Sequence, residues 1–119
     1  MTKTTTLLGL VIILMIGAFY FTRSPGLGAS DVRLYVRHNV ADYAVWKKGY
    51  DAFTPMRGDV FHQAVFQSAS DPKDVTVIHD FHSMEAAQAF ANSPQLKEAM
   101  GKIGVVGAPQ IWFTKLGAK

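Results

Sequence analysis

The chain has 119 residues, a length that allows one domain, and it carries a formal net charge of +3. From residue 24 onward it keeps 10 basic residues against all 9 acidic ones, without any block of like charges, which argues against a nucleic-acid partner. The absence of cysteine excludes disulfides, thiolate catalysis and cysteine-ligated metals.

The N-terminal segment is strongly apolar. Residues 4–22 contain no charged side chain, and these 19 residues come close to the roughly 20 that a helix needs to span a bilayer. Tyr20 and Phe21 lie at the far end of this stretch, where aromatic rings favour the membrane interface, and Arg23 follows. A cleaved signal peptide shares a positive start and an apolar run, but the length favours an anchor.

This pattern predicts three parts along the chain. Residues 1–23 are expected to form a single transmembrane helix, residues 24–30 a flexible linker, and residues 31–119 the folded domain. A short N-terminal tail before a first helix usually stays in the cytoplasm, so we expect the domain on the extracytoplasmic side, which is the periplasm in a Gram-negative cell.

The domain begins with a predicted strand and helix. Apolar and polar residues alternate from Asp31 to His38, which is typical of a strand with one buried face. Asn39 is expected to cap the following helix, with Asp42 in its first turn. An aromatic stripe at helical spacing marks the buried side of this helix, namely Tyr43, Trp46, Tyr50 and Phe53 together with Val40.

In the second half of the domain, the sequence predicts two more strands, two helical pieces and a last strand. A strand over 60–68 places Val60, His62, Ala64 and Phe66 on one face, and a strand over 74–82 does the same for Val75, Val77, His79 and Phe81. Ser83 caps a helix, and Pro94 starts a second helical piece that runs to Met100. Glycines at 101, 104 and 107 mark a loop before a strand over 109–116.

The element order βαββαβ is that of an α+β, ferredoxin-like domain. Right-handed crossovers place the strands in the order 4-1-3-2 with both helical layers on one face. Four motifs then resemble the dimeric α/β-barrel superfamily, and within it the short bacterial proteins with antibiotic-biosynthesis-monooxygenase-like domains. They are Val36-x-His38-x-Val40-x-Asp42-Tyr43-x-x-Trp46-Lys47, Asp80-Phe81-x-Ser83-x-Glu85-x-Ala87, Phe90-Ala91-x-Ser93-Pro94-x-Leu96-Lys97-Glu98-Ala99-Met100 and Gly104-Val105-Val106-Gly107-x-Pro109.

This resemblance implies a homodimer whose two sheets pack face to face, and a small-molecule cavity between each sheet and its helices. Members of the superfamily include monooxygenases that act without a cofactor on polyketide-like phenols, so no cofactor is expected here. Tyr43, Trp46, Tyr50 and Phe81 become candidates for the substrate-binding wall, although such stripes are more often core. Trp112 is assigned to dimer packing.

Three histidines occupy the apolar phase of their strands. Taking the first and third strands as parallel, we expect His38, His62 and His79 at one end of the sheet, within reach of a shared ligand. Such a trio is consistent with satisfied structural groups, with substrate binding or acid–base catalysis, or with a transition-metal site. No paired carboxylate accompanies them, so a metal is the least favoured of the three.

Two functions remain open. The first is an enzyme, a cofactor-independent monooxygenase or cyclase in which His38 or His79 is the general base. The second is a non-catalytic dimeric module that holds a small ligand or a metal in a membrane complex. The anchor and the lack of a decisive catalytic constellation favour the second, and the family resemblance favours the first.

Overall fold

The computed structural model describes residues 26–53 and 57–118. Within these ranges the elements follow the predicted βαββαβ order, with the second helical layer in two pieces. They are β1 (Val32–Val40), α2 (Tyr43–Ala52), β2 (His62–Gln67), β3 (Asp74–Phe81), α3 (Met84–Ala91), α4 (Pro94–Lys102) and β4 (Val105–Thr114). The anchor predicted over residues 1–23 lies outside the described residues, and none of the described helices is long and apolar enough to cross a membrane.

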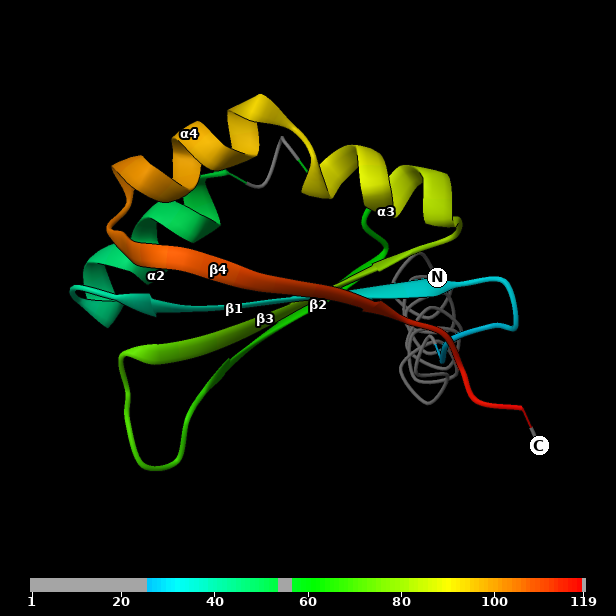
Figure 1. The fold of residues 1–119 in the computed structure, drawn as a ribbon, viewed down its shortest axis with the longest axis horizontal. Helices are drawn as coiled ribbons and strands as arrows, with labels where there is room; N and C mark the ends of the chain where they lie inside the picture. The colour runs from blue at the N-terminus through cyan, green and yellow to red at the C-terminus, as the bar shows by residue number, and fades with distance from the viewer. Residues whose placement is uncertain (1–25, 54–56, 119) are drawn as a thin grey trace, which may run out of the picture.

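The four strands form one sheet in the order β2-β3-β1-β4, as predicted, and α3 and α4 arch over one of its faces (Figure 1). Every neighbouring pair of strands is antiparallel. The prediction that the first and third strands run parallel is wrong. The crossover through α2 makes β1 parallel to β2, and β3 is inserted between them as the hairpin partner of β2, so it must oppose both.

The helix-covered face of the sheet carries the core in two clusters. Under α3, Val32, Leu34, Val36 and Phe81 pack with Ala87 and Ala91. Under α2, Val40, Val75 and Val77 pack with Trp46 and Tyr50. Small residues on α3 let its backbone approach the sheet closely, whereas α2 contacts the sheet through two large aromatic rings. The spacing between the helices and the sheet therefore differs along the domain.

Short polar side chains start each helix, as the sequence pattern required. The carboxylate of Asp42 accepts a hydrogen bond from the Val45 amide at 3.0 Å, so Asp42 is the N-cap of α2. The prediction that Asn39 caps this helix is wrong, because Asn39 is still in β1, opposite Asp74. Ser83 caps α3 as predicted, and Ser93 caps α4 with Pro94 in its first turn.

The last strand begins earlier than predicted. It starts at Val105, and its pairing with β1 shifts register between Arg37 and Asn39, which is a β-bulge. Gly104 and Gly107 adopt positive φ angles of 91° and 76°. Gly107 lies within β4 at this register shift, whereas Gly104 lies in the turn that precedes the strand and Gly101 lies in α4.

Candidate functional site

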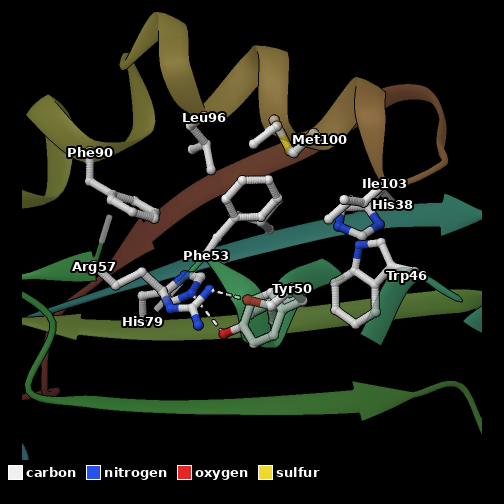
Figure 2. Close-up of a pocket in the computed structure, with 13 residues that line it drawn as sticks. His38, Trp46, Tyr50, Phe53, Arg57, His79, Phe90, Leu96, Met100 and Ile103 are labelled. Carbon is white, nitrogen blue, oxygen red and sulfur yellow. Dashed lines mark hydrogen bonds between the residues drawn. The ribbon is translucent and has the colours of Figure 1, made fainter. Parts of the chain in front are cut away.

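An apolar pocket lies between the helix-covered face of the sheet and the helices, where the family resemblance placed a cavity. Its internal volume is about 50 Å³. Figure 2 shows its wall, to which α2, α4 and four strand residues contribute most of the side chains. The lining residues are Val36, His38, Trp46, Tyr50, Phe53, Arg57, Val77, His79, Phe90, Leu96, Ala99, Met100 and Ile103. We call this the inner pocket.

His79 is the most enclosed polar group of the inner pocket, with 4% of its surface exposed. Its Nε2 lies 3.0 Å from the Tyr50 hydroxyl, and that hydroxyl donates to Oε1 of Gln63 at 3.3 Å. Nδ1 of His79 is buried and has no hydrogen-bond partner among the described residues. Burial and the positive charge of Arg57 lower the pKa of His79 to about 4, so the imidazole is neutral at physiological pH.

Arg57 brings a buried positive charge to the same wall. Its guanidinium carbon lies 4.1 Å from the centre of the Tyr50 ring, and Nη1 donates to the Tyr50 carbonyl at 2.9 Å. Figure 2 shows Arg57 beside His79 and Tyr50 at one end of the inner pocket. Burial raises the pKa of Tyr50 to about 12, which keeps the phenol protonated. A cation over an aromatic face is stabilised by the ring quadrupole, so the guanidinium is fixed in place.

His38 lies at the opposite end of the inner pocket, next to Trp46 and Ile103 (Figure 2). Its ring packs edge-on against Trp46 with 5.4 Å between ring centres. Burial lowers its pKa, and its Nδ1 is buried without a hydrogen-bond partner in the described part of the chain. His38 is paired with Val75, and His79 with Leu34, so the two histidines are four residues apart along the sheet.

His62 does not join them. It is paired with Asp80, whereas its neighbour Gln63 is paired with His79, so the alternation of side chains sends His62 to the uncovered face of the sheet. There its Nδ1 lies 3.0 Å from Oδ2 of Asp80. The prediction of three histidines at one end is therefore wrong: antiparallel pairing separates His38 from His79, and the strand phase separates His62 from both. Within the described residues no group of three or more potential ligands is arranged to hold a metal.

The predicted aromatic residues divide between pocket and core. Trp46 and Tyr50 line the inner pocket, stacked with 5.0 Å between their ring centres. Tyr43 packs behind Trp46 at 5.9 Å and is not part of the lining. Phe81 belongs to the core cluster under α3, where it contacts Phe90. Trp112 stacks on Tyr35 at 4.9 Å on the uncovered face, and its assignment to dimer packing stays a prediction.

Several lining residues were not predicted as site residues from the sequence. Arg57 stands in a turn-like Arg-Gly-Asp segment, and nothing in that pattern indicates that its side chain folds inward. Leu96, Met100 and Ile103 recur at helical spacing across α4, so a longer helical piece would have identified them as a lining face. Helical spacing on α3 would have identified Phe90 in the same way.

Comparison with solved structures identifies the fold. A protein from Bordetella bronchiseptica, provisionally assigned as an antibiotic biosynthesis monooxygenase, superposes with a TM-score of 0.64 at 14% sequence identity, covering 75% of this chain and 99% of its own. SnoaB from Streptomyces nogalater, a cofactor-independent oxygenase, gives a TM-score of 0.62 at 8% identity, covering 76% and 97%. A protein from Caulobacter crescentus with the same provisional assignment gives 0.59 at 15% identity, covering 76% and 92%.

No protein-family model matches the sequence, and no curated protein matches it either. Identities this low show the fold alone. The chain therefore has the α+β fold of antibiotic biosynthesis monooxygenase domains, as the sequence motifs predicted.

Proposed function

We propose that the domain binds a compact aromatic molecule in the inner pocket and acts on it as a cofactor-independent monooxygenase or cyclase. The observation that carries this proposal is an apolar, aromatic-walled pocket with a neutral, buried imidazole at each end. The fold shared with SnoaB, itself a cofactor-independent oxygenase, supports the same class of chemistry. Polyketide-like phenols remain the substrate class that the resemblance suggests.

The size of the inner pocket restricts what it can take. Ligand sites usually measure roughly 300–1,000 Å³, and a cavity of about 150 Å³ is enough for benzene. At about 50 Å³, the inner pocket accepts one ring only if lining side chains move. Met100 and Leu96 on α4 are suited to this, since methionine in particular adapts to irregular spaces. We therefore expect one ring of the substrate inside and the remainder at the mouth.

The chemistry follows from the protonation states. A neutral imidazole can accept a proton, and His79 or His38 would serve as the general base that converts a phenol into its anion. Burial and Arg57 set the low pKa of His79. A phenolate beside His79 would raise that pKa, and Arg57 would stabilise the anion. Trp46 and Tyr50 would hold the ring.

The test is oxygen uptake by the full chain in the presence of a panel comprising a phenol, a naphthol and an anthrone. His38→Gln and His79→Gln, singly and together, are compared with the wild type. We expect the variant of the true base to lose about 100-fold or more in rate, the range that general-base catalysis contributes. His82→Gln, which alters an exposed histidine outside the inner pocket, is the matched control. Unchanged turnover in the double variant would show that neither histidine is the base.

A second candidate is a non-catalytic binding module. It is favoured by the small volume of the inner pocket and by the enclosure of both Nδ1 atoms, which leaves little room beside the imidazoles. This candidate predicts that a naphthol perturbs the NMR signals of Trp46 and Met100 without any oxygen uptake. Uptake that depends on His79 would exclude it.

The N-terminal segment is proposed to anchor the domain to a membrane as a single-pass helix with the domain on the extracytoplasmic side. The uncharged stretch over residues 4–22 supports this. The full chain should stay in the membrane fraction after alkaline carbonate extraction, and protease added to spheroplasts should degrade the domain. Release of a shortened chain by a signal peptidase would instead indicate a cleaved signal.

A homodimer through the uncovered face of the sheet is proposed as well. This face carries large exposed rings, with Phe66 53% and Trp112 39% exposed and Tyr35 stacked on Trp112. Burying such groups is the usual driving force for association. Analytical ultracentrifugation of wild type and Phe66→Lys should give a dimer and a monomer, respectively. A monomeric wild type at micromolar concentration would contradict the proposal.

A further inference from the structure

One wall atom of the inner pocket lacks the hydrogen bond that its burial calls for. Among the residues that the structure describes, Nδ1 of His79 has no hydrogen-bond partner, and the residue is only 4% exposed. Buried polar atoms in folded proteins are almost always paired. A ligand in the inner pocket can supply the partner. Whether that ligand must donate or accept depends on which nitrogen of His79 carries the ring proton.

The other ring nitrogen answers this. Nε2 of His79 lies 3.0 Å from the Tyr50 hydroxyl, which has a single proton to donate. That proton goes to Oε1 of Gln63 at 3.3 Å. The Tyr50 oxygen is therefore the acceptor toward His79, and Nε2 carries the ring proton. Because the imidazole is neutral, Nδ1 then holds the lone pair and accepts a hydrogen bond.

Gln63 sets this arrangement from outside the inner pocket. It is an exposed residue of β2, the edge strand, and it does not belong to the pocket lining. It is paired with His79 across the two strands, so both side chains lie on the helix-covered face of the sheet. From there it reaches the Tyr50 hydroxyl on α2. A glutamine that a ligand would not touch thus determines, through Tyr50, which kind of hydrogen bond the pocket offers.

Arg57 restricts the charge of the ligand. Its guanidinium carbon lies 4.1 Å from the centre of the Tyr50 ring, and Figure 2 shows it beside His79. A fixed positive charge in a partly desolvated site repels a cationic donor such as an ammonium group. The remainder of the lining is mainly apolar. The matching donor is therefore a neutral N–H or O–H group on an apolar ring.

We infer that Gln63 is a positioning residue that makes the inner pocket selective for neutral rings that carry a hydrogen-bond donor. The donor of the ligand binds Nδ1 of His79, and no proton has to be transferred. This inference rests on the part of the proposed function that places the ligand in the inner pocket. It does not depend on turnover, so it applies to an enzyme and to a binding module alike.

The tautomer of His79 is measured first, on the full chain in detergent micelles at neutral pH. Long-range ¹H–¹⁵N NMR correlations should place the ring proton on Nε2. In Gln63→Leu the Tyr50 hydroxyl loses its acceptor and should donate to Nε2, which moves the ring proton to Nδ1. Gln63→Glu keeps an acceptor and should keep the wild-type tautomer. Gln67→Leu is the matched control on the same strand, because Gln67 bonds to the Pro72 carbonyl instead.

The selectivity is measured with pyrrole and furan. The two rings have the same size, but pyrrole donates an N–H and furan has no donor. Titrations followed by the Met100 methyl signal, with empty micelles as the blank for partitioning, give the ratio of the two affinities. One hydrogen bond changes an affinity by about fivefold, so the preference for pyrrole over furan should fall by about that factor in Gln63→Leu. It should be retained in Gln63→Glu and Gln67→Leu.

The outcomes separate this inference from the proposed function. A ring proton on Nδ1 of His79 in the wild type would overturn the role of Gln63. So would an unchanged tautomer and an unchanged ratio of affinities in Gln63→Leu, which is the result expected if Gln63 were merely structural. Binding of neither ring would overturn the selectivity together with the proposed ligand site, whichever tautomer is found.

Discussion

The Tyr50 hydroxyl and Nε2 of His79 are 3.0 Å apart, although 29 residues separate them along the chain. This contact joins α2 to the second strand of the sheet, β3, at one end of the inner pocket. The hydroxyl also donates to Oε1 of Gln63, at the longer distance of 3.3 Å. The pair therefore ties the helix to the sheet through a polar contact inside an apolar surrounding.

Tyr50→Phe should destabilise the domain by about 1–3 kcal/mol, because it removes the hydroxyl and leaves Nε2 of His79 buried without a partner. Urea denaturation followed by tryptophan fluorescence measures the change in the free energy of unfolding. Tyr43→Phe, on the same helix and also packed against Trp46, is the control and should change stability by less than about 0.5 kcal/mol. Equal effects of the two changes would mean that the contact contributes nothing.

The stability of the domain should decrease between about pH 6.5 and pH 4. The pKa of His79 is lower in the folded state than its ordinary value of 6.5, so between the two values the unfolded chain binds a proton that the native state does not. The stabilisation is fully present above pH 6.5 and is lost as the pH falls toward 4, amounting to about 3 kcal/mol. Burial of His38 acts in the same direction.

Denaturation midpoints measured across this pH range test the effect. In His79→Gln the decrease should be distinctly smaller, although that variant is less stable at neutral pH. An identical pH dependence in wild type and His79→Gln would show that His79 is not kept neutral by the fold.

Gly49→Ala should destabilise the domain despite the higher helix propensity of alanine. A Cβ atom at Gly49 would collide with Ile103, approaching its Cβ to 2.9 Å, so α2 and α4 would have to separate. We expect a net loss of about 1–3 kcal/mol from overpacking. Gly101→Ala is the matched control in α4, where the added Cβ meets nothing within 4 Å, and it should gain up to about 1 kcal/mol.

Combining Gly49→Ala with Ile103→Ala tests the cause of that loss. If the collision is responsible, the double variant should recover part of the loss from Gly49→Ala, and thermal denaturation would reveal a coupling energy between the two sites. Strict additivity would place the cause elsewhere.

Two arginine–aspartate pairs offer a comparison of buried and exposed ion pairs. Asp80→Asn removes the charge partner of Arg33, whose side chain is 27% exposed, and should cost about 2 kcal/mol or more. Asp74→Asn breaks a pair of the same two-bond geometry with Arg37, which is 51% exposed, and should cost less than about 1 kcal/mol. Chemical denaturation at low and high salt measures both, and equal losses would contradict the dependence on burial.

The sequence pattern was sufficient for the fold. Alternation in the strands, the aromatic stripe of α2, the cap at Ser83 and the helix start at Pro94 led to the element order and the strand order that the structure has. These features are local, so each is readable from a short window. The start of the last strand was harder to predict from the sequence, because Gly107 lies at a bulge within a paired strand and not in a loop.

The site was harder to predict, for two physical reasons. The face to which His62 points depends on the register between β2 and β3, and a shift of one residue reverses it. Ala64 and Phe66 made the wrong phase look apolar, because they lie on the uncovered face with His62, where Phe66 is 53% exposed. Val60 precedes β2 and packs against the core cluster under α3. The role of Arg57 depends on tertiary packing onto Tyr50, which no local pattern encodes.

The interruption between α3 and α4 has a mechanical consequence. An unbroken helix over residues 84–102 would be a straight rod laid across a twisted surface, and it would touch that surface along only part of its length. Because α3 ends at its C-cap Asn92 and α4 begins at its N-cap Ser93, the two helices run in different directions over the sheet (Figure 1). α3 packs closely on the sheet through its alanines, whereas α4 is a separate helix over Trp46 and Tyr50. Movement of α4 would open the inner pocket without disturbing the packing beneath α3.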